Sequence, residues 1–314
     1  MAEKQNNILQ WNDYSSYIRR TFGERVQKIS VNAGFTCPNR DGKISREACM
    51  YCTNKSFSPF YCNSDYSIAK QLEKGISFFS PKYKAQKYLA YFQTYTNTYA
   101  EANTLKLKYD EALAVHDVIG LVISTRPDCI DDEKLELLAD YAKNKYVEIE
   151  FGLESTKNST LEFINRGHTY EQAVEAIHKA NDYGLMCGVH LILGLPYESE
   201  EDIYLHAKKI SELPISTLKL HQMQVLKDTR LEKFYAENPQ SIIDLSLDNY
   251  VRIASNFLDM LNPEIIVERL TSESPREMLI YPDWNGKKNF EIAHIVNSYM
   301  KSKGMFQGRT FVVK

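Results

Sequence analysis

The chain has 314 residues, of which 43% are hydrophobic and 25% are charged. This composition supports a sizeable folded core and excludes intrinsic disorder, collagen-like repeats and small disulfide scaffolds. The 41 acidic and 38 basic residues give a formal net charge of −3, so no overall electrostatic field draws the chain to nucleic acid or to an anionic membrane. No stretch approaches the roughly 20 apolar residues that span a bilayer, so we expect a cytoplasmic protein without a membrane partner.

Short apolar runs alternate with segments of helical period, which predicts an α/β fold with a parallel sheet. Two helices are expected to begin with capping boxes, where Thr169 is followed by Gln172 and Ser199 by Asp202. Gly184 stands where the first of these helices should end. The six predicted strands are residues 28–33, 88–93, 119–124, 147–153, 187–193 and 217–222.

Six such units fit either an open doubly wound sheet or an incomplete version of the eight-unit barrel. Both architectures place functional groups at the carboxyl ends of the strands, and periodicity alone does not choose between them. After residue 224 the pattern changes to predicted helices at 231–237, 250–261 and 290–303 and an extended run at 265–269. No flexible linker precedes this change. We therefore expect a core at 1–224 with an extension at 225–314 packed on it.

The cysteine pattern is the first chemical signal. Six cysteines are too few for a disulfide framework in a chain of this length. Three of them, Cys37, Cys49 and Cys52, form a C-x11-C-x2-C array directly after the first predicted strand. Structural zinc needs four ligands, which Cys62 would complete, whereas an iron–sulfur cube held by three thiolates has one open iron. Cys62 is otherwise expected to be a free thiol.

The cysteine loop, at 34–62 and with Tyr51 before its last cysteine, resembles that of the radical S-adenosylmethionine (SAM) superfamily. Further motifs are similar, in the same order, to those of its YhcC/YtqA-like subgroup, which is related to the catalytic subunit of Elongator. These motifs are CPNRDG, AYFQTYTNTYA, STRPDC, EFGLES, INRGHT, HLILGLP, LKLHQMQVLK, ERLTSESPRE and MFQGR. The similarity runs from about Phe22 to about Gln307. It implies a partial (βα)6 TIM-like barrel with a C-terminal α/β extension.

The resemblance also implies the chemistry. Cys37, Cys49 and Cys52 would hold a [4Fe–4S] cluster whose open iron binds SAM. An electron from an external reductant of the flavodoxin or ferredoxin type would cleave SAM to a 5′-deoxyadenosyl radical, which abstracts hydrogen from the substrate. In this branch of the family the implied partner is tRNA. The implied reaction converts the carboxymethylaminomethyl group on C5 of the wobble uridine to aminomethyl.

The same motifs supply the other candidate site residues. Strand alternation places Glu148, Glu150 and Gly152 on one face of the fourth predicted strand. It places Lys219 and His221 on one face of the sixth. Lys219 and Cys129 are the catalytic candidates that the resemblance implies. The predicted cofactor-binding residues are Tyr51, Gln93, Thr94, Arg126, Glu150, Glu154, His190 and Gly194.

Structural roles are alternatives for several of these residues. Arg126 could pair with Asp128 instead of a ligand, and Cys129 could be a small buried hydrophobe. The sequence also departs from the family pattern, because Glu154 stands where relatives usually have glutamine and Tyr197 where they have glycine. Two further functions stay open. One is a radical SAM enzyme acting on a small molecule, and the other is a non-catalytic zinc- or cluster-bearing module that binds RNA or protein.

Overall fold

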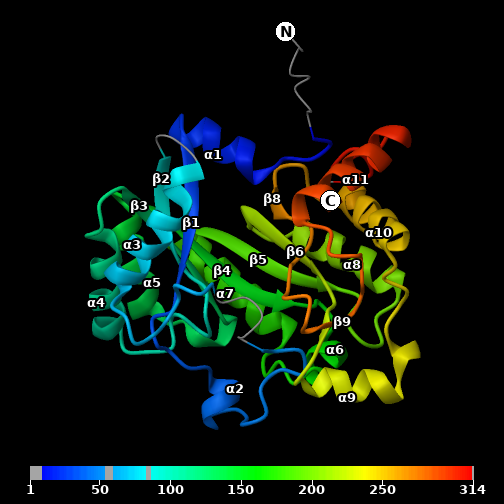
Figure 1. The fold of residues 1–314 in the computed structure, drawn as a ribbon, viewed down its shortest axis with the longest axis horizontal. Helices are drawn as coiled ribbons and strands as arrows, with labels where there is room; N and C mark the ends of the chain where they lie inside the picture. Colours follow the sequence, from blue (N-terminus) through cyan, green and yellow to red (C-terminus); the bar gives the residue numbers. More distant parts are fainter. Residues whose placement is uncertain (1–8, 54–58, 83–85, 313–314) are drawn as a thin grey trace.

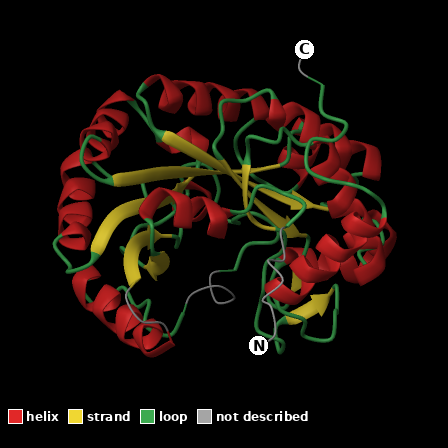
Figure 2. Ribbon diagram, turned by 90° about the horizontal axis from the view of Figure 1, so that it is seen from above, coloured by secondary structure: helices red, strands yellow, loops and turns green. Residues whose placement is uncertain are grey.

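The computed structural model describes residues 9–53, 59–82 and 86–312. Its main feature is a sheet of seven parallel strands in the order β1-β2-β3-β4-β5-β6-β8 (Figure 1). The sheet curls into part of a barrel, with helices around its outer side (Figure 2). The fold is therefore the predicted α/β partial barrel. The strands are β1 Arg25–Val31, β2 Gln86–Phe92, β3 Val118–Thr125, β4 Tyr146–Glu154, β5 Met186–Leu193, β6 Thr217–Gln222 and β8 Ile266–Arg269.

All six predicted strands are confirmed, and a seventh joins them. The extended run at 265–269, which we expected to lie in the extension, is β8, and it pairs in parallel with β6. Thr217 lies opposite Ile266, and Lys219 lies opposite Arg269. The edge of β6 offers unpaired backbone groups that a further strand can satisfy. The chain after residue 224 therefore extends the sheet as well as covering it.

Helices that connect successive strands bury their apolar faces against the outer side of the sheet. Leu135, Ile177 and Ile203 from three of these helices are fully buried in the main core. Both predicted capping boxes are present, and Gly184, with φ +73°, follows the helix at 170–182 as expected. The connecting helices are α3 Ile68–Phe79, α4 Ala102–Leu113, α5 Asp132–Ala142, α7 Tyr170–Asp182, α8 Glu200–Ser211 and α10 Leu247–Met260.

The remaining α-helices and a two-stranded sheet lie around this barrel. The helices are α1 Tyr14–Phe22, α2 Pro38–Asp41, α6 Asn158–Phe163, α9 Arg230–Glu237 and α11 Asn289–Ser302, and β7 Val225–Leu226 pairs antiparallel with β9 Leu279–Tyr281. In the part of the chain that the structure describes, no helix is long and apolar enough to cross a membrane.

One end of the barrel is bridged between its first and last strands. Helix α1 contacts both β1 and β8 and lies across the space between them (Figure 1). The N–H of Val267 donates to the carbonyl oxygen of Asn12 at 2.8 Å, just before this helix. Below it, Lys28 Nζ of β1 lies 2.5 Å from Glu268 Oε2 of β8. These contacts close the amino end of the barrel and leave the carboxyl end open.

Inside the barrel, side chains form layers. Leu89, Tyr91 and Val122 form a small apolar cluster that is separate from the main core. The ammonium groups of Lys28 and Lys219 lie 5.4 and 4.3 Å from the ring centre of Tyr91 in this cluster. The carboxyl ends of the strands lie beyond them. A site at those ends therefore has a polar floor.

Candidate active site

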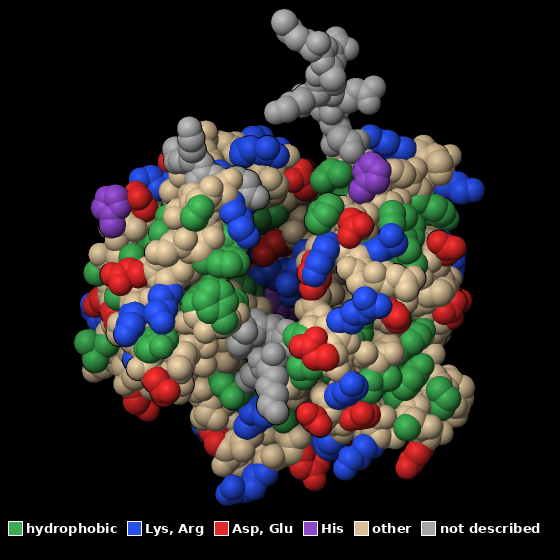
Figure 3. Space-filling model, in the orientation of Figure 1, with side chains coloured by type: hydrophobic (Ala, Val, Ile, Leu, Met, Phe, Trp, Pro, Cys, Tyr) green, Lys and Arg blue, Asp and Glu red, His purple; other side chains and the backbone are tan. Residues whose placement is uncertain are grey.

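A cavity of about 250 Å³ opens at the carboxyl ends of the strands. Figure 3, which views the molecule from the same side as Figure 1, shows a hollow in the middle of the molecule with charged and histidine side chains inside it. One wall comes from the loop after β1 and the ends of β2 to β4. The opposite wall comes from the ends of β5, β6 and β8 and from residues 223–226 and 272–274. The cavity thus joins the predicted cofactor loop to the C-terminal part of the chain.

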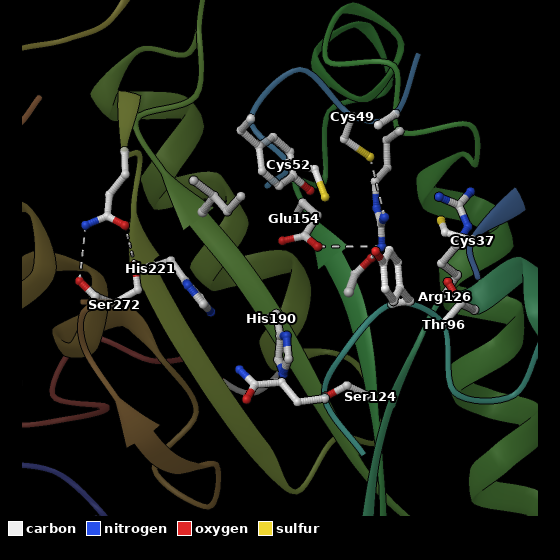
Figure 4. A pocket seen from close by; sticks show the side chains of 18 of the residues that line it. Cys37, Cys49, Cys52, Thr96, Ser124, Arg126, Glu154, His190, His221 and Ser272 are labelled. Carbon is white, nitrogen blue, oxygen red and sulfur yellow. Dashed lines mark hydrogen bonds and ion pairs between the residues drawn. The ribbon is translucent and has the colours of Figure 1, made fainter. Parts of the chain in front are cut away.

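The three predicted ligand cysteines meet in the first wall. Cys37 directly precedes the short helix α2, which has proline at its first position and ends at Gly42 with φ +97°. The N–H of Cys52 donates to the carbonyl oxygen of Cys49 at 3.1 Å, which turns the second part of the loop. Met50 is tied to Ile164 by a backbone hydrogen bond of 3.0 Å. All three thiols therefore line the same cavity (Figure 4).

Basic and amide groups surround these thiols. Arg40 Nη2 donates to Cys52 Sγ at 3.2 Å, and Asn39 Nδ2 donates to Cys49 Sγ at 3.5 Å. Burial raises the pKa of Cys52, and so does the neighbouring Cys49, whereas Arg40 opposes the rise. Metal ligation requires thiolates, and hydrogen bonds to sulfur also tune the potential of an iron–sulfur cluster. Arg40 is therefore a site residue that our prediction missed, although it belongs to the CPNRDG motif.

The spacing of the thiols tests which metal centre fits. Tetrahedral zinc, with Zn–S bonds of about 2.3 Å, would bring its sulfur atoms to about 3.8 Å from one another. Among the described residues, only Glu148, Glu150 and Glu268 offer three ligand atoms within 4.8 Å of one another, and the cysteines do not. At least two of the three thiols thus lie farther apart than in a closed zinc site. An iron–sulfur cube is larger than a zinc ion and does not require its three thiolate ligands to lie that close.

Cys62 does not serve as a fourth ligand. Its thiol donates to the carbonyl oxygen of Ser30 at 2.9 Å, and it is not part of the cavity wall. Burial raises its pKa to about 12, so the thiol is neutral. In this structure Cys62 therefore does not complete a four-cysteine site, and its position agrees with the free thiol that we expected.

Arg166 connects the cysteine loop to β4, and sequence analysis did not single it out within INRGHT. Its Nη1 lies 3.8 Å from Cys49 Sγ, and its Nη2 donates to the carbonyl oxygen of Gly152 at 2.6 Å. Nη2 is also 3.5 Å from Glu154 Oε1. Burial disfavours its charge, but Tyr51, Glu154 and Cys49 outweigh burial and raise the pKa of Arg166.

Gly152 makes room for this arginine. A Cβ at position 152 would lie 2.5 Å from Arg166 Nη2 and 2.7 Å from Glu154 Oε1. Glu154 itself adopts a φ of +68°, which a residue with a side chain rarely adopts, and its carboxylate faces the cavity next to Arg166 (Figure 4). The backbone at the end of β4 is thus shaped around the Arg166–Glu154 pair.

Arg126 lines the cavity and pairs with Asp128, as the structural alternative predicted. Two parallel bonds of 2.8 Å join its Nε and Nη2 to the two carboxylate oxygens of Asp128. Its Nη1 is buried and has no hydrogen-bond partner among the described residues. The ion pair therefore fixes the guanidinium and leaves one nitrogen for a ligand.

Glu150 and Lys219 lie beneath the cavity instead of in its wall. Lys219 Nζ is 2.6 Å from both carboxylate oxygens of Glu150 and 2.9 Å from the hydroxyl of Tyr91. Glu150 also accepts from Ser124 Oγ at 2.8 Å and faces His190 Nε2 at 3.0 Å. Burial raises the pKa of Glu150, but Lys219 and Lys28 outweigh it and hold that pKa well below its ordinary value. With their polar atoms engaged, these two residues position His190 and Tyr91, which do line the cavity.

Three more predicted residues lie outside the cavity lining. Thr94 is buried beside two residues that do line it, Gln93 and Tyr95. The Cys129 thiol lies 4.0 Å from Asp128 Oδ1, and burial raises its pKa to about 12, so it is a neutral buried group. Gly194 has a φ of +85°, and a Cβ there would meet Leu245 at 3.0 Å, so this glycine serves packing. The predicted residues that line the cavity together are Cys37, Cys49, Tyr51, Cys52, Gln93, Arg126, Glu154 and His190.

Apart from His190 and His221, the opposite wall was not singled out from the sequence, although it contains parts of two quoted motifs. Gln222 Nε2 donates to the carbonyl oxygen of Ser272 at 3.0 Å, and its Oε1 accepts from the N–H of Ser272 at 3.0 Å (Figure 4). Ser274 Oγ donates to Gln224 Oε1 at 2.7 Å. Residues 221–224 (HQMQ) thus hold residues 271–274 (TSES) in place at the end of β6.

Comparison with known proteins agrees with this geometry. The sequence profile of the Radical SAM superfamily matches residues 34–210, and that of the Radical_SAM C-terminal domain matches residues 215–302. The chain belongs to the radical SAM superfamily. This radical SAM protein is 33% identical to YtqA of Bacillus subtilis over 306 residues, which cover 98% of this chain and 94% of YtqA. The predicted family is therefore confirmed, and with it the enzyme class.

More distant relatives link this radical SAM enzyme to the Elongator branch. It is 24% identical over 195 residues to a tRNA uridine(34) acetyltransferase of Methanocaldococcus jannaschii, covering 61% of this chain and 34% of that protein. Among solved structures, Elp3 of Methanocaldococcus infernus has a TM-score of 0.67 at 17% identity, over 90% of this chain and 64% of that chain. The Elp3 match shows the shared fold.

Proposed function

We propose that Cys37, Cys49 and Cys52 hold a [4Fe–4S] cluster and that SAM binds beside it in the cavity. When bound, the cluster and SAM together supply a 5′-deoxyadenosyl radical for hydrogen abstraction, using one electron from a flavodoxin- or ferredoxin-type reductant. The observation that carries this proposal is the meeting of three thiols in one cavity at the strand ends. At least two of these thiols lie farther apart than in a closed zinc site, and Arg40 lies on one of the three.

Two charged residues of the cavity wall would bind the charged groups of the methionyl part of SAM. Arg126 Nη1, which lacks a partner among the described residues, would donate to the methionyl carboxylate. Glu154 would accept from the amino group. Tyr51 and Tyr95 offer ring faces in the same wall. The segment at 272–274 would exclude water from the opposite side of the cavity.

For the substrate, we propose tRNA bearing a carboxymethylaminomethyl group on C5 of the wobble uridine, which the enzyme would convert to aminomethyl. Hydrogen abstraction from the carbon next to the carboxylate, loss of one further electron and hydrolysis of the resulting imine by water would release the two-carbon unit as glyoxylate. The support is the relative named as a tRNA uridine(34) acetyltransferase and the open carboxyl end of the barrel, which suits a macromolecule.

Electron paramagnetic resonance tests the cofactor proposal. We expect the reduced, anaerobically prepared protein to show a [4Fe–4S]⁺ signal that changes when SAM is added. The signal should be lost or altered in Cys52→Ala and kept in Cys62→Ala, because the Cys62 thiol is bonded to Ser30 outside the cavity. A silent protein that carries stoichiometric zinc would contradict the proposal.

Nucleoside analysis of tRNA tests the substrate proposal. A strain that lacks the gene should accumulate carboxymethylaminomethyluridine at the wobble position and lose the aminomethyl nucleoside. The wild-type gene should restore the profile, and the Cys52→Ala gene should not. An unchanged profile in the deletion strain would refute tRNA as the substrate and favour a small molecule.

A further inference from the structure

Four arginines line the cavity, and one of them differs from the other three. Arg40 bonds to the Cys52 thiol, Arg126 to Asp128, and Arg166 pairs with Glu154. Arg269, at the end of β8, contacts neither a carboxylate nor a thiol among the described residues. Burying half of a guanidinium without an anionic partner costs free energy of desolvation in the free protein. Such a group is a strong hydrogen-bond donor to a ligand that carries an anion.

A neutral histidine orients this arginine. Arg269 Nη2 lies 2.8 Å from His221 Nε2 and 3.4 Å from His221 Nδ1. Because a guanidinium can only donate, the imidazole accepts in this contact, which a neutral imidazole can do. Burial and then Arg269 itself hold the pKa of His221 well below its ordinary value. Arg269 Nε is buried and has no hydrogen-bond partner in the described part of the chain. The histidine thus fixes the arginine without neutralising it.

The place of Arg269 separates it from the cysteines. Strands β1 and β8 approach each other at the amino end of the barrel, but at its carboxyl end the cysteine loop and Arg269 belong to different parts of the cavity lining. His221 and Ser272, which belong to the same wall as Arg269, lie across the cavity from Cys37 and Arg126 (Figure 4). Hydrogen bonds from Gln222 and Gln224 hold the adjacent segment at 272–274. This wall is a rigid surface that faces the cofactor side.

We propose that Arg269, oriented by His221, binds a carboxylate of the substrate. This inference rests on the proposed function, in which the carboxymethylaminomethyl group carries a carboxylate that the aminomethyl product lacks. The fork of a guanidinium matches a carboxylate with two parallel hydrogen bonds. Arg269 therefore distinguishes substrate from product, because only the substrate supplies the missing negative charge.

The test compares the binding of two tRNAs that differ in this group. Anaerobic holoprotein is used without reductant, so that no turnover occurs, with tRNA bearing either carboxymethylaminomethyl- or aminomethyluridine. We expect the wild type to bind the carboxylate-bearing tRNA about 10- to 100-fold more tightly. Arg269→Gln should abolish this preference, and Arg269→Lys should keep part of it.

Arg276→Gln is the matched control, because it removes the same charge from an exposed position in the same segment. It should change the affinity for both tRNAs equally and by less than about five-fold. A wild-type preference that survives in Arg269→Gln would overturn this inference and leave the proposed function standing. A wild type that binds both tRNAs equally would overturn this inference alone, and a wild type that binds neither tRNA would overturn the proposed substrate as well.

A second measurement separates the carboxylate of the substrate from that of SAM. Equilibrium dialysis with SAM alone should give the same affinity for the wild type and Arg269→Gln. Lost SAM binding in Arg269→Gln, with the tRNA preference intact, would assign Arg269 to the cofactor and refute the proposal. Thermal unfolding of each variant verifies that it is folded.

Discussion

Two neighbouring regions of the barrel interior contain similar charged residues, and they differ in how those charges are satisfied. In the buried layer around Glu150, acids and bases face one another at distances of 2.5 to 3.4 Å. In the cavity above it, Arg126, Arg166 and Arg269 each keep a buried nitrogen without a partner among the described residues. Within the barrel interior, incomplete pairing of the charged groups, and not charge itself, distinguishes the cavity from the layer beneath it.

The buried layer shows why a group of acids here is not a metal site. Glu148, Glu150 and Glu268 place their carboxylate oxygens within 4.8 Å of one another. Lys28 Nζ contacts all three, at 3.4, 3.0 and 2.5 Å. Burial opposes its charge, but these carboxylates outweigh burial and raise the pKa of Lys28. The ammonium group supplies the positive charge that a cation would otherwise bring.

The largest expected effect comes from breaking this layer. Lys28→Met should lower the free energy of unfolding by about 3–5 kcal/mol, because it leaves buried carboxylates without their cation. Urea unfolding measures the change. Lys28→Arg should lose less, and Lys143→Met, at a lysine whose side chain is 71% exposed, should match the wild type within experimental error. A fully stable Lys28→Met protein would mean that the layer is not a coupled unit.

A smaller effect is expected where the cavity wall meets the cysteine loop. Gly152→Ala should push Arg166 away from Glu154 and Cys49, because the added Cβ would lie 2.5 Å from its Nη2. We expect a cost of about 1–3 kcal/mol from overpacking and a lower iron content after reconstitution. Urea unfolding and iron analysis measure the two effects.

A double variant shows whether Arg166 is the cause. If the clash lies with its guanidinium, adding Arg166→Gln to Gly152→Ala should cost less than the sum of the two single changes. Strict additivity of the two free energies would place the strain elsewhere in the wall.

The smallest expected effect is a pH dependence on the Arg269 side of the cavity. The folded protein keeps His221 neutral, and the unfolded chain protonates it near its ordinary pKa of about 6.5. The stability that neutral His221 contributes is therefore complete above about pH 6.5 and is lost as the pH falls below it. At pH 5.5 this loss should reach about 1 kcal/mol in the wild type.

His221→Gln should lose about 1 kcal/mol less free energy of unfolding than the wild type when the pH falls to 5.5. Glutamine does not titrate, and its amide oxygen can still accept a hydrogen bond from Arg269. Urea unfolding at pH 7.5, 6.5 and 5.5 for both proteins gives the difference between their slopes. Parallel curves would show that His221 is protonated in the folded protein, which contradicts its role as an acceptor.

The sequence by itself determined the strands, the helix caps and the cysteine loop. Alternating apolar runs placed all six strands, and Thr169 and Ser199 were identified as helix starts, because these signals depend on residues a few positions apart. The thiols of Cys37, Cys49 and Cys52 meet for a similar reason, since one loop after β1 carries all three.

Only the tertiary structure decided which charged residues are paired and which face the cavity. Lys28 and Glu268 are 240 residues apart in sequence and 2.5 Å apart in space, so no local pattern predicts their contact. Glu150 and Lys219 matched family motifs, yet they neutralise each other beneath the cavity. Arg269 was not singled out, because its missing partner becomes evident only when β8 completes the sheet. Pairing between distant strands sets local charge, and local charge determines where a ligand can bind.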